Sequence, residues 1–266
     1  MDLDIARLHA FALELAERAD ALSMRHFGGP VPAVTKPDGT PVTEADRAIE
    51  AELRSRIAQA WPEHAVFGEE QGGALHAAAP TWVLDPIDGT KNYMRGVPVF
   101  ATLIALVVDG RALLGVASAP ALGERWDAAE GLGARRNGAA IGVSAIAAVE
   151  HAHILHGDAD RFRDAPGLWA AFGDLHDEAW RMRGFGDYWN HLLVAAGAAE
   201  AAFERELPAW DVAALVAIVS EAGGRITDAH GASVLAPDHA ARPNLVVTSN
   251  GALHDALLAR LAPGLA

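Results

Sequence analysis

Two aspartates follow a short apolar run at residues 82–84, at the point where a buried strand would end. Asp85 and Asp88 stand three residues apart, and Pro86 between them cannot donate a hydrogen bond to a neighbouring strand. We therefore expect the strand to end at Asp85 and a tight turn to bring Asp88 beside it. Two carboxylates at one point favour a hard cation such as Mg²⁺, which takes oxygen ligands and often shares them with phosphate. Alone, the pattern also fits an Asp-Pro turn in which Asp88 caps a helix.

Other acidic residues occupy comparable positions elsewhere in the chain. Glu69 and Glu70 follow the apolar run at residues 66–67, and a buried strand there would turn one of their carboxylates inward. Asp211 begins an apolar helix, where it could cap the helix and bind a metal at once, because a carboxylate has spare lone pairs. Asp46 lies in a helical segment and, by its own pattern, is a solvated surface acid. Several separate segments thus supply candidate metal ligands.

Gly89 and Thr90 continue directly from Asp88 and are predicted to begin a short helix. Backbone N–H groups at the start of a helix have no partners within it and suit a phosphate group. The segment therefore predicts a site for a phosphorylated ligand next to a cation.

The composition limits the classes of function. The 266 residues carry a formal net charge of -14, which disfavours nucleic acid and anionic membranes as partners, because an acidic surface repels phosphate. The absence of cysteine excludes thiolate nucleophiles, thiolate metal sites and disulfides. The first residues lack the pattern of a secretory signal, and no apolar run reaches the about 20 residues of a membrane helix. We therefore expect a cytoplasmic protein.

Helical and strand patterns alternate along the chain and would position these acids. Apolar residues at helical spacing predict helices over residues 5–28 and 44–60, with a proline-containing loop at 31–41 between them. The Asp-Gly pair at 109–110 predicts a hairpin within residues 99–120. Further strands are expected at 126–140, 153–156, 180–184, 201–204 and 245–248, and further helices at 166–172, 188–197, 212–222 and 252–261.

This mixture of strands and helices indicates a single layered α/β domain over residues 1–266. We expect two parts of this domain to meet near residue 145. Residues 1–145 would contain the metal and phosphate site, and residues 146–266 the substrate-binding half.

The acidic segments also match, in order and approximate spacing, the motifs of one protein family. The segments are Thr43-Glu44-Ala45-Asp46, Gly68-Glu69-Glu70, Asp85-Pro86-Ile87-Asp88-Gly89-Thr90, Trp210-Asp211 and Glu221-Ala222-Gly223-Gly224. With them the chain resembles the inositol monophosphatase family over nearly its whole length. The combination is far more specific than any one of these motifs alone.

The resemblance implies a five-layered α-β-α-β-α fold, usually a homodimer, and lithium-sensitive catalysis with two or three Mg²⁺ ions per subunit, or with Mn²⁺. One ion would be held by Glu69, Asp85 and the Ile87 carbonyl oxygen. A second would be held by Asp85, Asp88 and Asp211, and a third, weaker ion would lie near Glu69.

The resemblance also implies roles for the residues around these ions. Thr90, paired with Asp46 and supported by Glu70, would orient and deprotonate the attacking water. The N–H groups of Gly89 and Thr90 would bind the phosphate. Two metal ions about 3.5–4 Å apart lower the pKa of a water and neutralise the attacking and leaving oxygens, so no covalent nucleophile is required.

One subgroup of the family is the most similar. Residues 88–106 and 183–187 resemble the bacterial histidinol-phosphate phosphatases, whereas inositol phosphatases typically have Ser or Ala where Asp187 stands. Histidinol phosphate carries an ammonium and an imidazole, which favour carboxylates, and inositol carries only hydroxyls. Asp187 and the less diagnostic Glu204 could bind this cation, although Asp187 could also be a loop acid or an N-cap. The expected substrate-binding residues are Gly89, Thr90, Arg183, Asp187, Glu204 and Asp211.

Other functions remain open at this point. The first alternative is an inositol-1-monophosphatase or a sugar phosphatase of broad specificity. A haloacid-dehalogenase phosphatase is disfavoured, because its nucleophile stands two residues before its second aspartate, and Asp85 and Asp88 are three apart. Some family relatives act through binding to RNA-processing or transcription proteins, but every expected metal ligand is present here. The expected partner is therefore a small phosphorylated metabolite.

Overall fold

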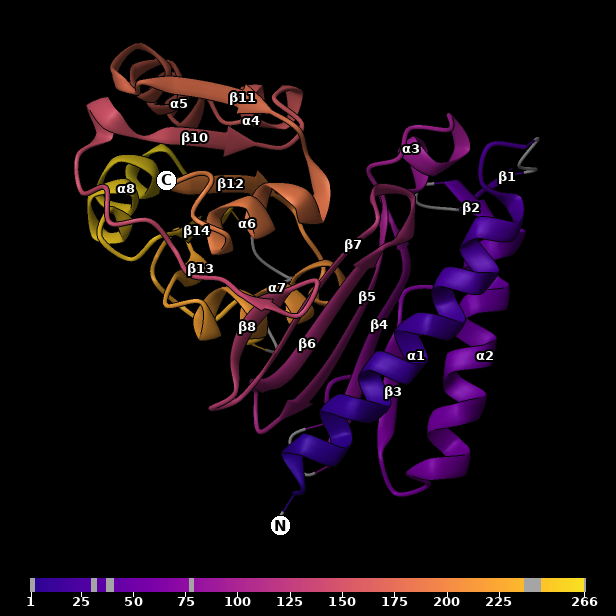
Figure 1. Ribbon diagram of the computed structural model, residues 1–266. Coiled ribbons are helices and arrows are strands. Elements are labelled where there is room, and N and C mark those ends of the chain that lie inside the picture. Colours follow the sequence, from indigo (N-terminus) through magenta and orange to yellow (C-terminus); the bar gives the residue numbers. More distant parts are fainter. Residues whose placement is uncertain (1–2, 30–32, 37–40, 77–78, 237–244, 266) are drawn as a thin grey trace.

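The computed structural model describes residues 3–29, 33–36, 41–76, 79–236 and 245–265. Within these residues, helices and sheets alternate in five layers (Figure 1). The α-β-α-β-α fold predicted from the sequence is therefore confirmed. No helix in the described part of the chain is both long and apolar enough to span a membrane.

A seven-stranded sheet is built from the first half of the chain. Its first two strands pair in parallel, and all the later pairs are antiparallel between strands that follow one another in sequence. The hairpin predicted around Asp109-Gly110 is present, with both residues at positive φ. In spatial order the strands are β3 (Ala65–Gly68), β4 (Thr81–Asp88), β5 (Ala101–Val108), β6 (Arg111–Ala119), β7 (Glu124–Ala129), β8 (Gly133–Arg136) and β9 (Ala139–Ala140).

Strand β4 continues beyond the point where the sequence predicted its end. We expected it to stop at Asp85, but it extends to Asp88, and its register with β5 shifts between these two residues. Pro86 is tolerated because β3 pairs only with the residues of β4 before Asp85, so no strand on that side requires an N–H from Pro86. Residues three apart in a regular strand face opposite sides. The register shift therefore replaces the predicted turn and allows both carboxylates to reach one point.

A five-stranded sheet is built from the second half of the chain. Strand β10 pairs in parallel with both its neighbours, and β14 pairs antiparallel with both of its own. The expectation of one domain with two parts meeting near residue 145 stays a prediction, although the two sheets lie on either side of that residue. In spatial order the strands are β11 (Arg181–Gly184), β10 (His153–His156), β12 (Ala201–Arg205), β14 (Leu245–Ser249) and β13 (Arg225–Asp228).

The helices form the three remaining layers (Figure 1). Helices α1 (Ile5–His26) and α2 (Glu44–Ala60) cover the outer face of the larger sheet. Helices α6 (Asp187–Ala195) and α7 (Ala209–Glu221) lie between the two sheets. The outer face of the smaller sheet is covered by α4 (Asp160–Arg163), α5 (Pro166–Glu178) and α8 (His254–Leu261). The short helices are α3 (Thr90–Met94) and the 3₁₀ turns η1 (Pro120–Leu122), η2 (Val149–His151) and η4 (Ala262–Leu265).

The sequence prediction missed several short elements. Residues 31–41 were expected to be a loop, but β1 (Ala33–Thr35) pairs antiparallel with β2 (Pro41–Thr43), and residues 30–32 and 37–40 lie outside the described residues. All three residues of β1 are exposed, so no apolar alternation marks the strand. Strand β13 and helix α4 were also missed, because each contains a single apolar residue among polar ones and so shows no apolar pattern.

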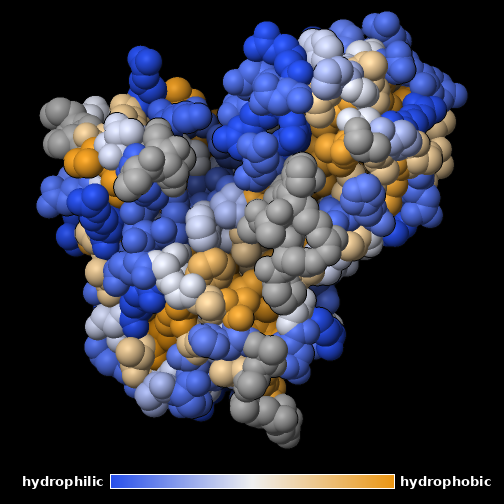
Figure 2. Space-filling model, turned by 180° about the vertical axis from the view of Figure 1, so that it is seen from behind, coloured by the Kyte–Doolittle hydropathy of each residue, from blue (hydrophilic) through white to orange (hydrophobic). Residues whose placement is uncertain are grey.

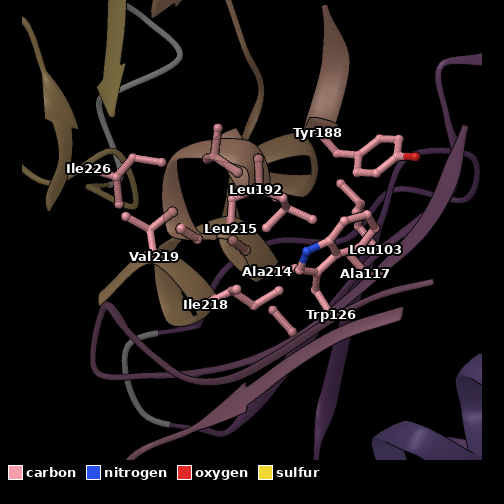
Figure 3. Packing of buried hydrophobic residues seen from close by; sticks show 14 of the residues in the cluster. Leu103, Ala117, Trp126, Tyr188, Leu192, Ala214, Leu215, Ile218, Val219 and Ile226 are labelled. Carbon is pink, nitrogen blue, oxygen red and sulfur yellow. The ribbon is translucent and has the colours of Figure 1, made fainter. Parts of the chain in front are cut away.

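The largest hydrophobic cluster lies between the larger sheet and the middle helices. Figure 3 shows Trp126 and Leu103 from the sheet close to Ala214 and Ile218 of α7, with Leu192 of α6 beside them. All these side chains are buried, and complete burial of a large apolar side chain contributes about 1.5–3 kcal/mol. This cluster fixes α7, and with it the start of that helix, against the larger sheet.

The close approach of α7 to β6 predicts an effect of Gly115→Ala on stability. A Cβ at Gly115 would lie 2.3 Å from the carbonyl oxygen of Ala214 and 2.9 Å from its Cα, and backbone atoms cannot move aside cheaply. We expect a loss of about 1–3 kcal/mol in the free energy of unfolding, measured by urea denaturation. Gly173→Ala is the control, because Gly173 lies exposed in α5 with no atom within 4 Å of its added Cβ. That variant should gain up to about 1 kcal/mol, and equal stability of the two variants would contradict the packing.

Candidate active site

A cavity of about 470 Å³ lies where the end of β4, helix α3, the end of β12 and the start of α7 meet. Figure 2 shows a hollow between the two upper lobes of the molecule, and hydrophilic residues surround it. Most of the site residues predicted from the sequence line this cavity, namely Glu69, Asp85, Ile87, Asp88, Gly89, Thr90, Asp187, Glu204 and Asp211.

Asp85, Asp88 and Asp211 form one acidic group although they come from β4 and α7. One carboxylate oxygen of each lies within 4.8 Å of the other two. The N–H of Ile87 donates to Asp85 Oδ1 at 3.0 Å, and the N–H of Tyr188 donates to Asp88 Oδ2 at 2.7 Å. Asp211 lies in the first turn of α7, where no side chain caps the helix, so its carboxylate is not used as an N-cap. The three acids are thus directed at one point.

The charges of this group repel one another. Burial, and then the neighbouring carboxylates, raise the pKa of Asp85, Asp88 and Asp211 well above the ordinary aspartate value. Ionising several carboxylates in a buried cluster is unfavourable when no cation is bound. A divalent ion would offset both the free energy of burying their charges and the repulsion between them. A donor set made only of clustered oxygens fits a hard cation such as Mg²⁺.

A second acidic group adjoins the first. Carboxylate oxygens of Asp46, Glu69 and Glu70 lie within 4.8 Å of one another. The ammonium of Lys36 lies 2.8 Å from Glu69 Oε1 and 2.5 Å from Glu70 Oε1. Burial raises the pKa of Asp46 to about 6, against the lowering effect of its hydrogen bonds with Thr43, and burial also raises the pKa of Glu70. A positive charge therefore already lies beside Glu69, where the family resemblance implies an ion.

Thr90 and Asp46, which were predicted to act as a pair, have other partners. The hydroxyl of Thr90 donates to the carbonyl oxygen of Ile87 at 2.9 Å. Asp46 Oδ2 accepts from the N–H and the hydroxyl of Thr43 at 2.8 and 2.5 Å, in a capping box at the start of α2. Asp46 Oδ1 is buried and has no hydrogen-bond partner among the described residues. The pairing of Thr90 with Asp46 therefore stays a prediction, with Asp46 Oδ1 as the free acceptor.

Asp187 and Glu204 line the cavity from α6 and β12. Asp187 has a φ of 55°, in the left-handed region that Asp and Asn tolerate best among residues with a side chain. Its Oδ2 accepts from Asn92 Nδ2 at 3.1 Å, and its N–H donates to Glu204 Oε1 at 3.4 Å. Burial, and then the charge of Glu204, raise the pKa of Asp187 to about 7. Asp187 does not cap α6, and the pair of acids suits a cationic ligand.

The structure does not bring Arg183 into the cavity. Arg183 lies on the edge strand β11, where Met182 faces inward and Arg183 is exposed, and its guanidinium donates to the carbonyl oxygen of Met182.

The sequence analysis missed the basic residues at the site. The basic residues that line the cavity are Lys36, Lys91, Arg161 and Arg205. Isolated basic residues in segments without a periodic pattern give no signal that would place them there.

The chain is similar to known proteins both in sequence and in structure. The chain matches the family model described as "Inositol monophosphatase family" over residues 4–264. A histidinol-phosphatase of Mycobacterium tuberculosis is 44% identical over 95% of this chain and 97% of that protein. A histidinol-phosphatase of Streptomyces coelicolor is 42% identical over 93% of this chain and 94% of that protein. The solved structure of a Thermotoga maritima IMPase has a TM-score of 0.84 and 31% identity, and covers 97% of this chain and 98% of its own.

The repulsion within the acidic group predicts that Asp85→Asn stabilises the metal-free protein. Because the pKa of Asp85 is raised, the folded state loses stability as the pH rises from the ordinary value, about 4, through the folded pKa. With a chelator at about pH 8, the variant should unfold a few degrees higher than the wild type, about 2–4 °C for each kcal/mol gained. Thermal unfolding followed by circular dichroism measures this, and the difference should shrink towards about pH 4. A difference that is the same at both pH values would contradict the repulsion.

Proposed function

Because the chain belongs to the inositol monophosphatase family, we propose that it is a magnesium-dependent phosphatase that hydrolyses histidinol phosphate to histidinol and phosphate. The observation that carries the proposal is the presence in one cavity of two kinds of acidic group. The Asp85, Asp88 and Asp211 group suits a divalent cation with phosphate, and Asp187 with Glu204 suits a cationic leaving group. A homodimer and sensitivity to lithium stay predictions of the family resemblance, and a cytoplasmic location stays a prediction from the sequence pattern.

The acidic groups would hold the metal ions. Glu69, Asp85 and the Ile87 carbonyl oxygen would bind one Mg²⁺, and Asp85, Asp88 and Asp211 a second, with Asp85 shared. A third ion near Glu69, or Mn²⁺ in place of Mg²⁺, belongs to the same proposal. When bound, such ions lower the pKa of a water and neutralise charge on the attacking and leaving oxygens.

The remaining residues would position the phosphate and the water. The N–H groups of Gly89 and Thr90, at the start of α3, would donate to the phosphate oxygens. Thr90 would orient the attacking water, and Asp46, with Glu70 beside it, would accept its proton through the free Oδ1. The water oxygen would bond to phosphorus as the ester P–O bond breaks, and the proton that Asp46 accepts would return through solvent to the leaving oxygen, so that histidinol leaves as an alcohol. Correct positioning of a proton acceptor typically contributes about 10²–10⁴ in rate.

The substrate itself would be recognised through its positive charge. Two neighbouring carboxylates, Asp187 and Glu204, repel each other, and this repulsion contributes to the raised pKa of Asp187. An ammonium bound between them would relieve this repulsion. Inositol 1-phosphate has only hydroxyls to offer, so it would leave this repulsion in place.

A comparison of two substrates tests the proposed function. Phosphate release from histidinol phosphate and from inositol 1-phosphate is measured with the same protein at saturating Mg²⁺. We expect kcat/KM to be at least about tenfold higher for histidinol phosphate, the ratio that about 1.4 kcal/mol of extra binding provides. Equal or faster hydrolysis of inositol 1-phosphate would instead support an inositol phosphatase or a sugar phosphatase of broad specificity.

Asp187→Asn tests how the substrate is chosen. Asparagine has the same shape and tolerates the positive φ of this position, but it removes the charge. A charge-assisted contact contributes about 1.5–3 kcal/mol, so kcat/KM for histidinol phosphate should fall about tenfold to a hundredfold. The internal control is an uncharged phosphate ester, whose turnover should hardly change because the metal ligands are untouched. An unchanged ratio between the two substrates would remove Asp187 from the specificity site.

A further inference from the structure

Helix α2 contains a fully buried acid, Glu50, that has no part in the reaction described above. Its carboxylate lies against the turn that follows β3. Oε2 accepts from the N–H of Glu70 at 2.7 Å, and Oε1 accepts from the N–H of Gln71 at 2.9 Å and from Arg54 Nε at 2.8 Å. Successive N–H groups that converge on one point form an anion-binding nest. In this chain the anion in the nest is the protein's own Glu50.

The same contact explains the glycine at the start of the Gly68-Glu69-Glu70 motif. A Cβ at Gly68 would lie 2.5 Å from the carboxyl carbon of Glu50, so a side chain fits there only if the Glu50 carboxylate moves away. The φ of Gly68 is not positive, and the backbone conformation alone therefore does not require glycine. Glycine at this position lets the Glu50 carboxylate lie against the turn.

Helix α2 connects this contact to the active site. Asp46 and Glu50 are four residues apart on the buried face of the helix. Asp46 belongs to the acidic group with Glu69 and Glu70, while Glu50 binds the backbone of the turn that carries them. One rigid helix thus sets the distance between Asp46 and this turn. The N–H of Glu69 is also held, by the carbonyl oxygen of Leu84 at 3.2 Å.

We propose that Glu50 is a positioning residue that fixes the Glu69–Glu70 turn, so that the Glu69 carboxylate is already oriented for a divalent cation in the metal-free protein. The inference rests on the proposed function in one respect, the assignment of Glu69 as a metal ligand. Residues that orient metal ligands typically change metal affinity about 10- to 100-fold when they are replaced. The effect of Glu50 should therefore appear in metal binding itself.

Two substitutions remove the contact from opposite sides. Glu50→Gln keeps the shape of the side chain but places an NH₂ where an oxygen accepted an N–H. Gly68→Ala leaves Glu50 in place and pushes its carboxylate away. The matched control is Glu52→Gln, because Glu52 pairs with Arg56 four residues later on the same helix, just as Glu50 pairs with Arg54, but lies at the surface.

The experiment measures the binding of Mn²⁺ and of Mg²⁺ to each metal-free protein by isothermal titration calorimetry. Thermal unfolding of the same samples, and the Mg²⁺ concentration for half-maximal phosphate release, are measured beside it. We expect Glu50→Gln and Gly68→Ala to weaken metal binding about 10- to 100-fold and to raise the half-maximal Mg²⁺ concentration similarly. Saturating Mg²⁺ should then restore most of the kcat, and Glu52→Gln should match the wild type.

Other outcomes would overturn the proposal. A purely structural role would lower the unfolding temperature and the active fraction without changing the metal dissociation constant of the folded protein. Loss of folding in both variants would likewise assign Glu50 to the stability of the fold.

A wild type that binds metal but does not hydrolyse histidinol phosphate would refute the proposed substrate alone, since the titrations still compare the variants. A wild type that binds no divalent ion would refute the metal assignment on which both proposals depend.

Discussion

Mutual repulsion of buried carboxylates is the constraint on which this structure depends. Asp85, Asp88 and Asp211 are like charges in a place where burial already disfavours charge, and only a rigid framework can keep them together. The framework is a strand in the interior of a seven-stranded sheet and the first turn of a helix packed on that sheet. Because a divalent cation relieves the repulsion, part of the driving force for binding it is present in the metal-free protein.

The middle layer of helices links the proposed metal ligands to the residues proposed to select the substrate. Asp88 accepts its hydrogen bond from the N–H of Tyr188, which belongs to the peptide unit directly after Asp187. Asp187 in turn receives a hydrogen bond from Asn92 on α3, next to the proposed phosphate-binding residues. A shift of α6 would therefore disturb the hydrogen bond of Asp88 and move Asp187 at the same time. One connected network would therefore set the geometry of both the phosphate and the leaving group in the proposed reaction.

The acidic residues that line the cavity could be predicted from the sequence because their signals are local. An acid after a buried apolar run lies at a strand end, and Asp85, Asp88 and Glu69 were found in this way and line one cavity. The features that were missed depend on tertiary contacts. The register shift within β4, the position of Lys36 beside Glu69, and the outward orientation of Arg183 on an edge strand leave no pattern along the chain. For the same reason, Glu50 cannot be distinguished by sequence from any other helical glutamate that has an arginine four residues later.

The hydrogen bond from Tyr188 to Asp88 joins residues 100 positions apart and has a consequence for the order of events during synthesis. The larger sheet is complete at residue 140, before the ribosome has made either α6 or α7. Until those helices emerge, the sheet lacks the apolar partner that covers its inner face, and Asp85 and Asp88 lack Asp211. Domains of a nascent chain generally fold as units from the N-terminus. A chain interrupted between the two sheets would therefore keep the strand that carries Asp85 and Asp88 but could not assemble the complete acidic group.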